Sequence, residues 1–105
     1  MIRRSHRWIR EAERRLKPRV IHDSVTQGLL CIHSHEGAWN DPNSPYWGGL
    51  QMDMNFQKAY GSEFLTRYGT ADRWPISAQL LAGRRAVKVR GYTPWMKTAA
   101  LCGLL

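Results

Sequence analysis

Apolar side chains recur at helical spacing along most of this chain, and they predict a first core helix over residues 22–36. One face of that helix consists of Val25, Leu29, Ile32 and Glu36. Gly37 follows directly, and glycine is a common helix terminator. The pattern therefore predicts a carboxylate at the end of an otherwise apolar helical face.

The same kind of pattern predicts several further helices, separated by short breaks. They cover residues 2–16 (ended by Pro18), 53–60 (ended by Gly61), 62–68 (ended by Gly69), 76–90 (with Ser77 as N-cap) and a last helix opened by Thr93-Pro94 and closed by Gly103. Residues 37–49 are rich in turn formers and predict a loop, and residues 50–52 predict a turn or a short strand. We therefore expect a mainly α, small single domain with a loop-rich middle and little or no sheet.

Charge divides the chain into two parts. Residues 1–22 contain eight of the 16 Lys and Arg residues but only two of the eight Asp and Glu residues, so they carry +6 of the net charge of +8. We therefore expect a basic N-terminal helical arm over 1–22 and a nearly balanced domain over 23–105. A basic arm favours an anionic partner, which is nucleic acid, an acidic membrane surface or an acidic cell wall.

Length and cysteine content limit the possibilities further. The chain has 105 residues, which suits one domain, and it has no apolar run near the roughly 20 residues of a membrane-spanning helix. It has two cysteines, Cys31 and Cys102. From the residues alone, they form either one disulfide or a pair of reduced thiols.

Glu36 is the first candidate for chemistry. Its place at the end of an apolar face implies partial desolvation, which favours the neutral, protonated carboxyl that a general acid requires. Cleavage of a glycosidic bond normally uses a second carboxylate, and Asp41 and Asp53 both follow closely. The structural alternatives are a surface glutamate before a helix-ending glycine, an Asx-turn at Asp41 and a helix cap at Asp53.

Aromatic and amide side chains are concentrated in the loop after Glu36. The candidate sugar-binding residues are Trp39, Asn40, Tyr46, Trp47 and Gln51. Aromatic rings stack on the apolar faces of sugars, while amides bind hydroxyl and acetamido groups. The alternative for an aromatic side chain is core packing, which we expect for Trp74 and Trp95.

Histidines raise the question of a metal site. His33 and His35 are two positions apart and point to different sides of a helix, so they do not match the spacing of His-Glu-x-x-His. We therefore expect neither a metal site nor a cofactor.

Taken together, these residues resemble a known family, the actinobacterial transglycosylase-like domains related to resuscitation-promoting factors, within the lysozyme-like superfamily. The most specific segment is Tyr46-Trp47-Gly48-Gly49-Leu50-Gln51, and the resemblance spans residues 31–104. Its other elements are Cys31, Glu36–Pro42, Met52-Asp53, Phe56-Gln57, Tyr60-Gly61, Trp74, Gln79, Ala86, Gly91, Pro94-Trp95, Thr98-Ala99 and Cys102-Gly103-Leu104.

The resemblance implies a lysozyme-like fold with a sugar-binding cleft and Glu36 as the catalytic glutamate. It implies peptidoglycan as substrate, cut at the β-1,4 bond between N-acetylmuramic acid and N-acetylglucosamine. It also implies a Cys31–Cys102 disulfide and an enzyme that works outside the cell or in the cell wall, as a monomer. One departure is that resuscitation-promoting factors have a cysteine directly before the glutamate, whereas Cys31 lies five residues earlier.

Two reactions remain open for such an enzyme. The family favours a lytic transglycosylase, in which Glu36 acts as acid and then as base. A more distant similarity to goose-type lysozymes, which have an aspartate after a comparable segment, favours Asp53 over Asp41 as the residue that would position water in a hydrolase. The alternatives from other classes are a non-catalytic wall-binding module and a nucleic-acid-binding protein that uses the basic arm.

Residues 1–19 lack the apolar core of a secretory signal. We therefore expect that a signal has been removed or that the protein reaches the wall by another route, such as a phage particle or lysis.

Overall fold

The computed structural model describes residues 23–105, and the predicted basic arm over 1–22 lies outside the described residues. The helices are α2 (Ser24–His35), α3 (Met54–Tyr60), α4 (Ser62–Tyr68), η1 (Ala71–Arg73), α5 (Ile76–Arg90), η2 (Thr93–Trp95) and α6 (Met96–Leu101). Within residues 23–105 the only β-type pairing is an isolated antiparallel bridge between Trp47 and Met52. The predicted mainly α class with little or no sheet is therefore confirmed.

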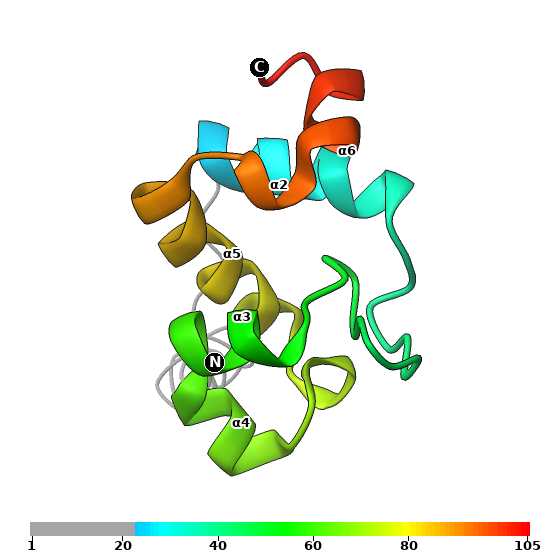
Figure 1. The fold of residues 1–105 in the computed structure, drawn as a ribbon, viewed down its shortest axis with the longest axis vertical. Helices are drawn as coiled ribbons and strands as arrows, with labels where there is room; N and C mark the ends of the chain where they lie inside the picture. The colour runs from blue at the N-terminus through cyan, green and yellow to red at the C-terminus, as the bar shows by residue number, and fades with distance from the viewer. Residues whose placement is uncertain (1–22) are drawn as a thin grey trace, which may run out of the picture.

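Helix α5 is the centre of the arrangement (Figure 1). Helix α2 packs against α5 and also against α6, and α3 packs against both α5 and α4. The long segment 36–53 leaves the end of α2 and returns to α3 along one side of the molecule (Figure 1). The helices thus form two groups joined by α5, with the irregular segment between them.

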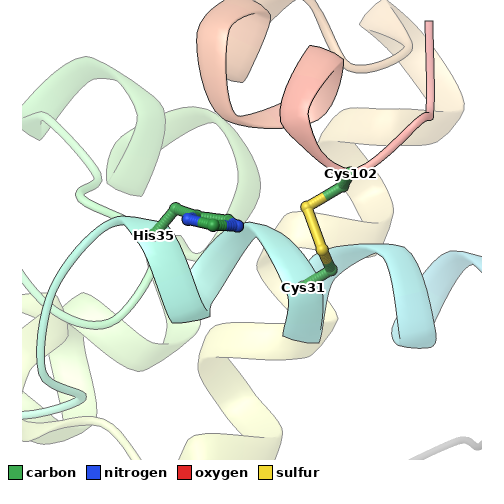
Figure 2. Close-up of side chains that lie close together, drawn as sticks. All are labelled: Cys31, His35 and Cys102. Atoms are coloured by element: carbon green, nitrogen blue, oxygen red, sulfur yellow. A yellow bond between two sulfur atoms is a disulfide. The ribbon is translucent and has the colours of Figure 1, made fainter.

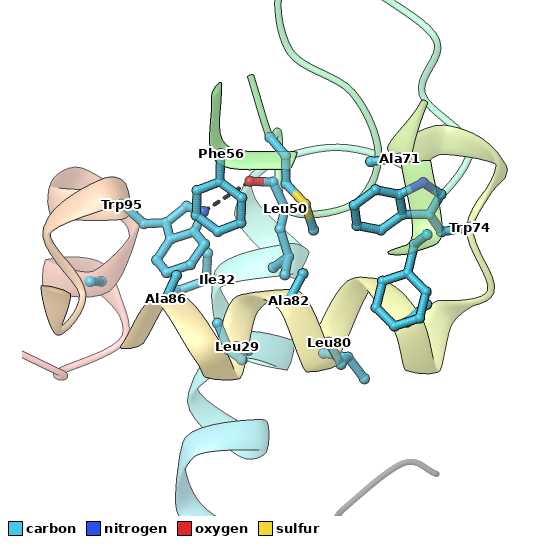
Figure 3. Packing of buried hydrophobic residues seen from close by; sticks show 14 residues of the cluster. Leu29, Ile32, Leu50, Phe56, Ala71, Trp74, Leu80, Ala82, Ala86 and Trp95 are labelled. Carbon is cyan, nitrogen blue, oxygen red and sulfur yellow. Dashed lines mark hydrogen bonds between the residues drawn. The ribbon is translucent and has the colours of Figure 1, made fainter. Parts of the chain in front are cut away.

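Small side chains on α5 allow this close packing. Its buried positions include Ala78, Ala82, Gly83 and Ala86. A methyl group on Gly83 would lie 2.9 Å from Leu50 Cδ1 and 3.1 Å from Leu29 Cδ1, so this glycine lets two neighbours approach the helix. Figure 3 shows the resulting core, in which leucines from α2 and from the irregular segment meet over the alanines of α5.

The predicted core aromatics are confirmed, since Trp74 and Trp95 are both buried. Trp74 Nε1 donates to Gly69 O at 2.7 Å, and Trp95 Nε1 donates to Leu50 O at 2.9 Å (Figure 3). Each indole therefore fills apolar space and also fixes a loop carbonyl.

Two helix starts differ from the sequence prediction. Ser77 was expected as the N-cap of α5, but Pro75 occupies that position and α5 begins at Ile76 without a side-chain cap. The last helix was expected to open at Thr93-Pro94, but a 3-10 turn comes first and α6 begins at Met96. The reason is Trp95, whose φ of −128° and ψ of 46° depart from helical values while its indole stays buried.

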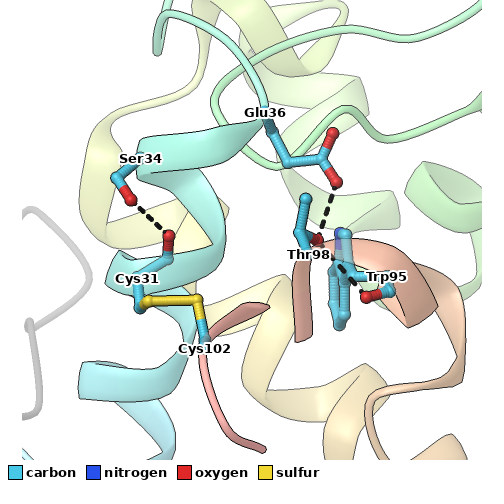
Figure 4. Close-up of a disulfide and its surroundings, with 6 residues drawn as sticks. All are labelled: Cys31, Ser34, Glu36, Trp95, Thr98 and Cys102. Atoms are coloured by element: carbon cyan, nitrogen blue, oxygen red, sulfur yellow. Dashed lines mark hydrogen bonds between the residues drawn. A yellow bond between two sulfur atoms is a disulfide. The ribbon is translucent and has the colours of Figure 1, made fainter. Parts of the chain in front are cut away.

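A disulfide joins Cys31 on α2 to Cys102 at the end of α6, as the family resemblance implied (Figure 4). The Cα atoms of the two residues are 6.0 Å apart, and the residues are separated by 71 positions in the sequence. The bond therefore holds the last helix against the first core helix.

Removing this disulfide is expected to lower the free energy of unfolding by roughly 4 kcal/mol, because a loop of this length loses much entropy when it is closed in the unfolded chain. Urea unfolding of the wild type with and without a phosphine reductant measures the loss. The double variant Cys31→Ser/Cys102→Ser is the control, and the reductant should leave its unfolding curve unchanged. Equal stability of oxidised and reduced wild type would contradict the expectation.

The N-terminus of α2 is fixed by Asp23. Its Oδ1 accepts from Thr26 N at 2.8 Å, and its Oδ2 pairs with Arg84 of α5. The backbone N–H of Thr26 and, after it, the guanidinium of Arg84 lower the pKa of Asp23 from 3.8 to about 2. The carboxylate thus caps one helix and links it to another.

A lowered pKa in the folded state means that Asp23 stabilises the fold above its ordinary pKa of 3.8, and that this contribution is lost as the pH falls from about 4 to about 2. We therefore expect Asp23→Asn, which keeps a cap but not the charge, to lower the melting temperature at pH 7. The difference from wild type should shrink as the pH approaches 2, measured by thermal unfolding across this range. A difference that is constant over the range would contradict this assignment.

None of the helices within residues 23–105 is both long enough and apolar enough to cross a membrane.

Candidate active site

Glu36 lies where α2 ends, as the sequence predicted. It is the C-cap residue, with φ of −99° and ψ of −84°, and it is half-buried. Leu29 and Ile32 on the same helix are fully buried, so the apolar face of α2 lies against the core and Glu36 stands at its rim. Its Oε1 accepts a hydrogen bond of 3.1 Å from Thr98 Oγ1 of α6 (Figure 4).

Asp41 and Gln51 lie against the residue that follows Glu36. A methyl group on Gly37 would lie 2.8 Å from Gln51 Nε2 and 3.0 Å from Asp41 Oδ2. These two side chains are themselves joined, because Gln51 Nε2 donates to Asp41 Oδ2 at 2.8 Å. The structure therefore brings one candidate second carboxylate next to Gly37, the residue that follows the candidate acid.

The Asx-turn considered for Asp41 is also present. Asp41 Oδ1 accepts from Asn43 N at 3.2 Å and from Asn43 Nδ2 at 2.6 Å. Asp41 thus orders the start of the loop in addition to contacting Gln51.

Asp53 acts as the N-cap of α3, which was the structural alternative for this residue. Its side chain accepts from Phe56 N at 2.7 Å, and the helix begins at Met54. The residue is exposed. Its described contact is therefore with its own helix and not with Glu36.

A tight turn over residues 47–52 presents Gln51. The backbone groups of Trp47 and Met52 exchange two hydrogen bonds, of 3.0 and 2.9 Å. Within the turn, Gln51 has a φ of 50°, which is uncommon for a residue with a side chain. Its side-chain Nε2 donates both to Asp41 Oδ2 and to Gly48 O. These two bonds stabilise the unusual backbone conformation of Gln51.

The predicted sugar-binding aromatics have different environments. Trp39 stacks on His33 with ring centroids 3.7 Å apart, and His33 Nδ1 donates to Gly49 O at 3.0 Å. Trp39 and Trp47 are partly buried against the core, whereas Tyr46 is 49% exposed. Asn40 is also exposed. Tyr46 therefore offers the most open ring, while Trp39 has one face covered by an imidazole.

Gln79 of α5 connects this loop to the core. The side chain is fully buried, and its Oε1 accepts from Gly49 N at 2.9 Å. Its Nε2 donates to Trp39 O at 2.9 Å and to Trp74 O at 3.2 Å. One amide thus satisfies backbone groups from two parts of the loop and from Trp74, which follows η1 and precedes α5.

The donor atoms of Cys31, His35 and Cys102 lie within 4.8 Å of one another (Figure 2). The two sulfur atoms are bonded to each other, so neither is a thiolate, which is the form of cysteine that binds metals. In this state the cluster is a disulfide beside an exposed imidazole.

Three roles were missed in the sequence. No role was predicted for Thr98, and no bonding partner was predicted for the side-chain amide of Gln79. His33 was considered only as a metal ligand, whereas it stacks on Trp39 and donates to Gly49 O. The one available signal was Gln79 itself, a polar residue among the buried positions of α5.

No protein-family model matches the chain, and no curated protein matches it either. The family resemblance therefore rests on the residues themselves.

Replacing Gln79 by leucine is expected to destabilise the protein by about 1–3 kcal/mol, because Gly49 N and the Trp39 and Trp74 carbonyls lose their partner. Denaturant unfolding measures the change. Gln27→Leu, at an exposed position of α2, is the matched control and should differ little from wild type. An equal effect of both substitutions would show that the bonds of Gln79 are unimportant.

Proposed function

We propose that this protein is a peptidoglycan-cleaving glycosidase with a lysozyme-like fold, more specifically a lytic transglycosylase, with Glu36 as its general acid and base. The observation that carries the proposal is the setting of Glu36. It is half-buried at the end of an apolar helix face and accepts from a neutral hydroxyl, and Asp41 and Gln51 lie against the next residue. A carboxyl is the group that normally acts as general acid in the cleavage of glycosidic bonds.

The proposed reaction uses this carboxyl twice. Glu36 first donates its proton to the glycosidic oxygen between N-acetylmuramic acid and N-acetylglucosamine, and the C–O bond breaks to leave an oxocarbenium-like sugar. The 6-hydroxyl of the muramic acid then attacks the anomeric carbon. Ionised Glu36 accepts the proton of that hydroxyl, so the enzyme is restored and the product is a 1,6-anhydro sugar.

The loop after Glu36 supplies the proposed sugar contacts. The exposed ring of Tyr46 can stack on a sugar face, and Asn40 can bind a hydroxyl or an acetamido group. Trp39 and Trp47 would present the ring surface that the core leaves free. The glycan strand is thus expected to lie along the segment that Gln79 anchors.

The proposed place of action is the cell wall or the extracellular space. The Cys31–Cys102 disulfide is compatible with an oxidising compartment. The basic residues 1–22 are proposed to assist through attraction to an anionic wall or membrane surface.

A second candidate is a hydrolytic lysozyme, because Asp41 Oδ2 lies against Gly37. A carboxylate in this place could orient a water molecule toward the oxocarbenium-like sugar, and the product would then have a reducing end. Between the two aspartates, the contacts favour Asp41 over Asp53, since Asp53 caps α3.

Glu36→Gln is expected to lower the rate of peptidoglycan cleavage roughly 100-fold or more, because the amide cannot donate or accept the proton of a general acid and base. Digestion of purified peptidoglycan measures the rate, and mass spectrometry identifies the products. Anhydro ends are expected from a transglycosylase, and reducing ends would instead identify the lysozyme.

Glu63→Gln is the matched control, since Glu63 lies on α4 and pairs with Arg85 at an exposed site. This variant should keep the wild-type rate. Unchanged wall lysis by Glu36→Gln would sink the proposal and would favour a non-catalytic wall-binding module. Absence of cleavage by the wild type, together with salt-sensitive DNA binding, would favour a nucleic-acid-binding protein.

A further inference from the structure

We infer that Thr98 is the positioning residue of Glu36 and that its hydroxyl serves both proton states of that carboxyl. The inference rests on the proposed function and adds a residue from the opposite end of the chain. Thr98 lies on α6, 62 positions after Glu36, and is half-buried. It does not touch the sugar in this scheme, and it acts through the orientation of Glu36.

The geometry gives the Thr98 hydroxyl two acceptors. Its Oγ1 lies 3.1 Å from Glu36 Oε1 and 3.3 Å from Trp95 O (Figure 4). A hydroxyl has one hydrogen and two acceptor lone pairs, so it can donate to only one of these oxygens at a time. The choice between the two acceptors requires only a rotation about the Cβ–Oγ1 bond.

This choice matches the two states of the proposed acid. When Glu36 is ionised, the Thr98 hydroxyl donates to Oε1, and a hydrogen bond to a charged oxygen is the stronger kind. When Glu36 carries the proton for the glycosidic oxygen on Oε2, Oε1 is a neutral carbonyl oxygen, and the hydroxyl can donate either to it or to Trp95 O, two acceptors of the same kind. The proton that moves in catalysis belongs to Glu36 throughout, and Thr98 keeps its own.

Other side chains could not serve both states. A lysine or arginine at this position would hold Glu36 in its ionised form and oppose the protonation that a general acid needs. A second carboxylate would disfavour the ionised form that must accept a proton after bond cleavage. A neutral group that both donates and accepts fits the cycle, and threonine is such a group.

The fold holds Thr98 in place from both sides along the chain. Three residues before it, Trp95 is buried, and its indole donates to Leu50 O. Four residues after it, Cys102 is bonded to Cys31 of α2 (Figure 4). Ala99, which directly follows Thr98, is fully buried. Helix α6, which carries the hydroxyl, is therefore joined by the disulfide to α2, the helix that ends at Glu36.

The test compares wild type, Thr98→Val and Thr98→Ser on a soluble peptidoglycan fragment. Valine keeps the branched shape but has no hydroxyl, so kcat is expected to fall roughly tenfold, as expected for the loss of one hydrogen bond to a charged group, while KM stays nearly constant. Serine keeps the hydroxyl and should restore most of kcat. Thr66→Val is the matched control, because Thr66 is exposed and its Oγ1 donates to the backbone carbonyl of Ser62 in the same helix, α4.

Three kinds of result overturn the inference. A wild-type kcat in Thr98→Val would show that the hydroxyl is dispensable, and an equal loss in Thr98→Ser or Thr66→Val would indicate a packing effect. If Thr98→Val does not fold, judged by its circular dichroism, Thr98→Ala is used with the same expectation. A wild type that leaves the fragment uncut overturns the proposed function as well, which distinguishes the two failures.

Discussion

The buried amide of Gln79 allows an irregular segment to lie against the helical core. A loop pressed onto α5 brings backbone N–H and C=O groups that cannot reach water, and each needs a partner. Gln79 pairs with Gly49 N–H and with the carbonyls of Trp39 and Trp74. Within residues 23–105 no buried side-chain nitrogen or oxygen lacks a partner. The loop can therefore be well ordered without being a strand or a helix.

Gln57 of α3 is a second buried glutamine whose side chain bonds to backbone groups. Its Nε2 donates to Met52 O at 3.0 Å, and its Oε1 accepts from Ala71 N at 2.9 Å. Together the two amides bind two positions of the tight turn that presents Gln51, Gly49 inside the turn and Met52 at its end. The loop after Glu36 thus depends on side chains from α3 and α5, and the loss of one amide would remove several backbone contacts of this loop at once.

Much of the helical framework could be predicted from the sequence, because apolar periodicity and helix-ending glycines are local signals. The expected helix over 76–90 and the stop at Gly61 are examples. The site was harder to predict. Thr98 contacts Glu36 across 62 positions, and Gln79 contacts Trp39 across 40 positions. Neither contact can be recognised from the spacing of apolar residues, because that spacing reports only local structure. The helix starts at Ser77 and Thr93 were wrong because Pro75 and buried Trp95 fixed the local backbone instead.

The contacts of Asp41 bear on which reaction the proposed enzyme performs. A carboxylate has about four acceptor positions, and three donors already reach Asp41, namely Asn43 N, Asn43 Nδ2 and Gln51 Nε2. Such a carboxylate is well suited to ordering a loop, and it has about one acceptor position left for a water molecule. Asp53 is likewise occupied as a helix cap. Because both aspartates order the backbone in this way, Glu36 is the one of these three carboxylates that we propose for proton transfer, and a reaction in which the substrate's own hydroxyl replaces water needs only that one.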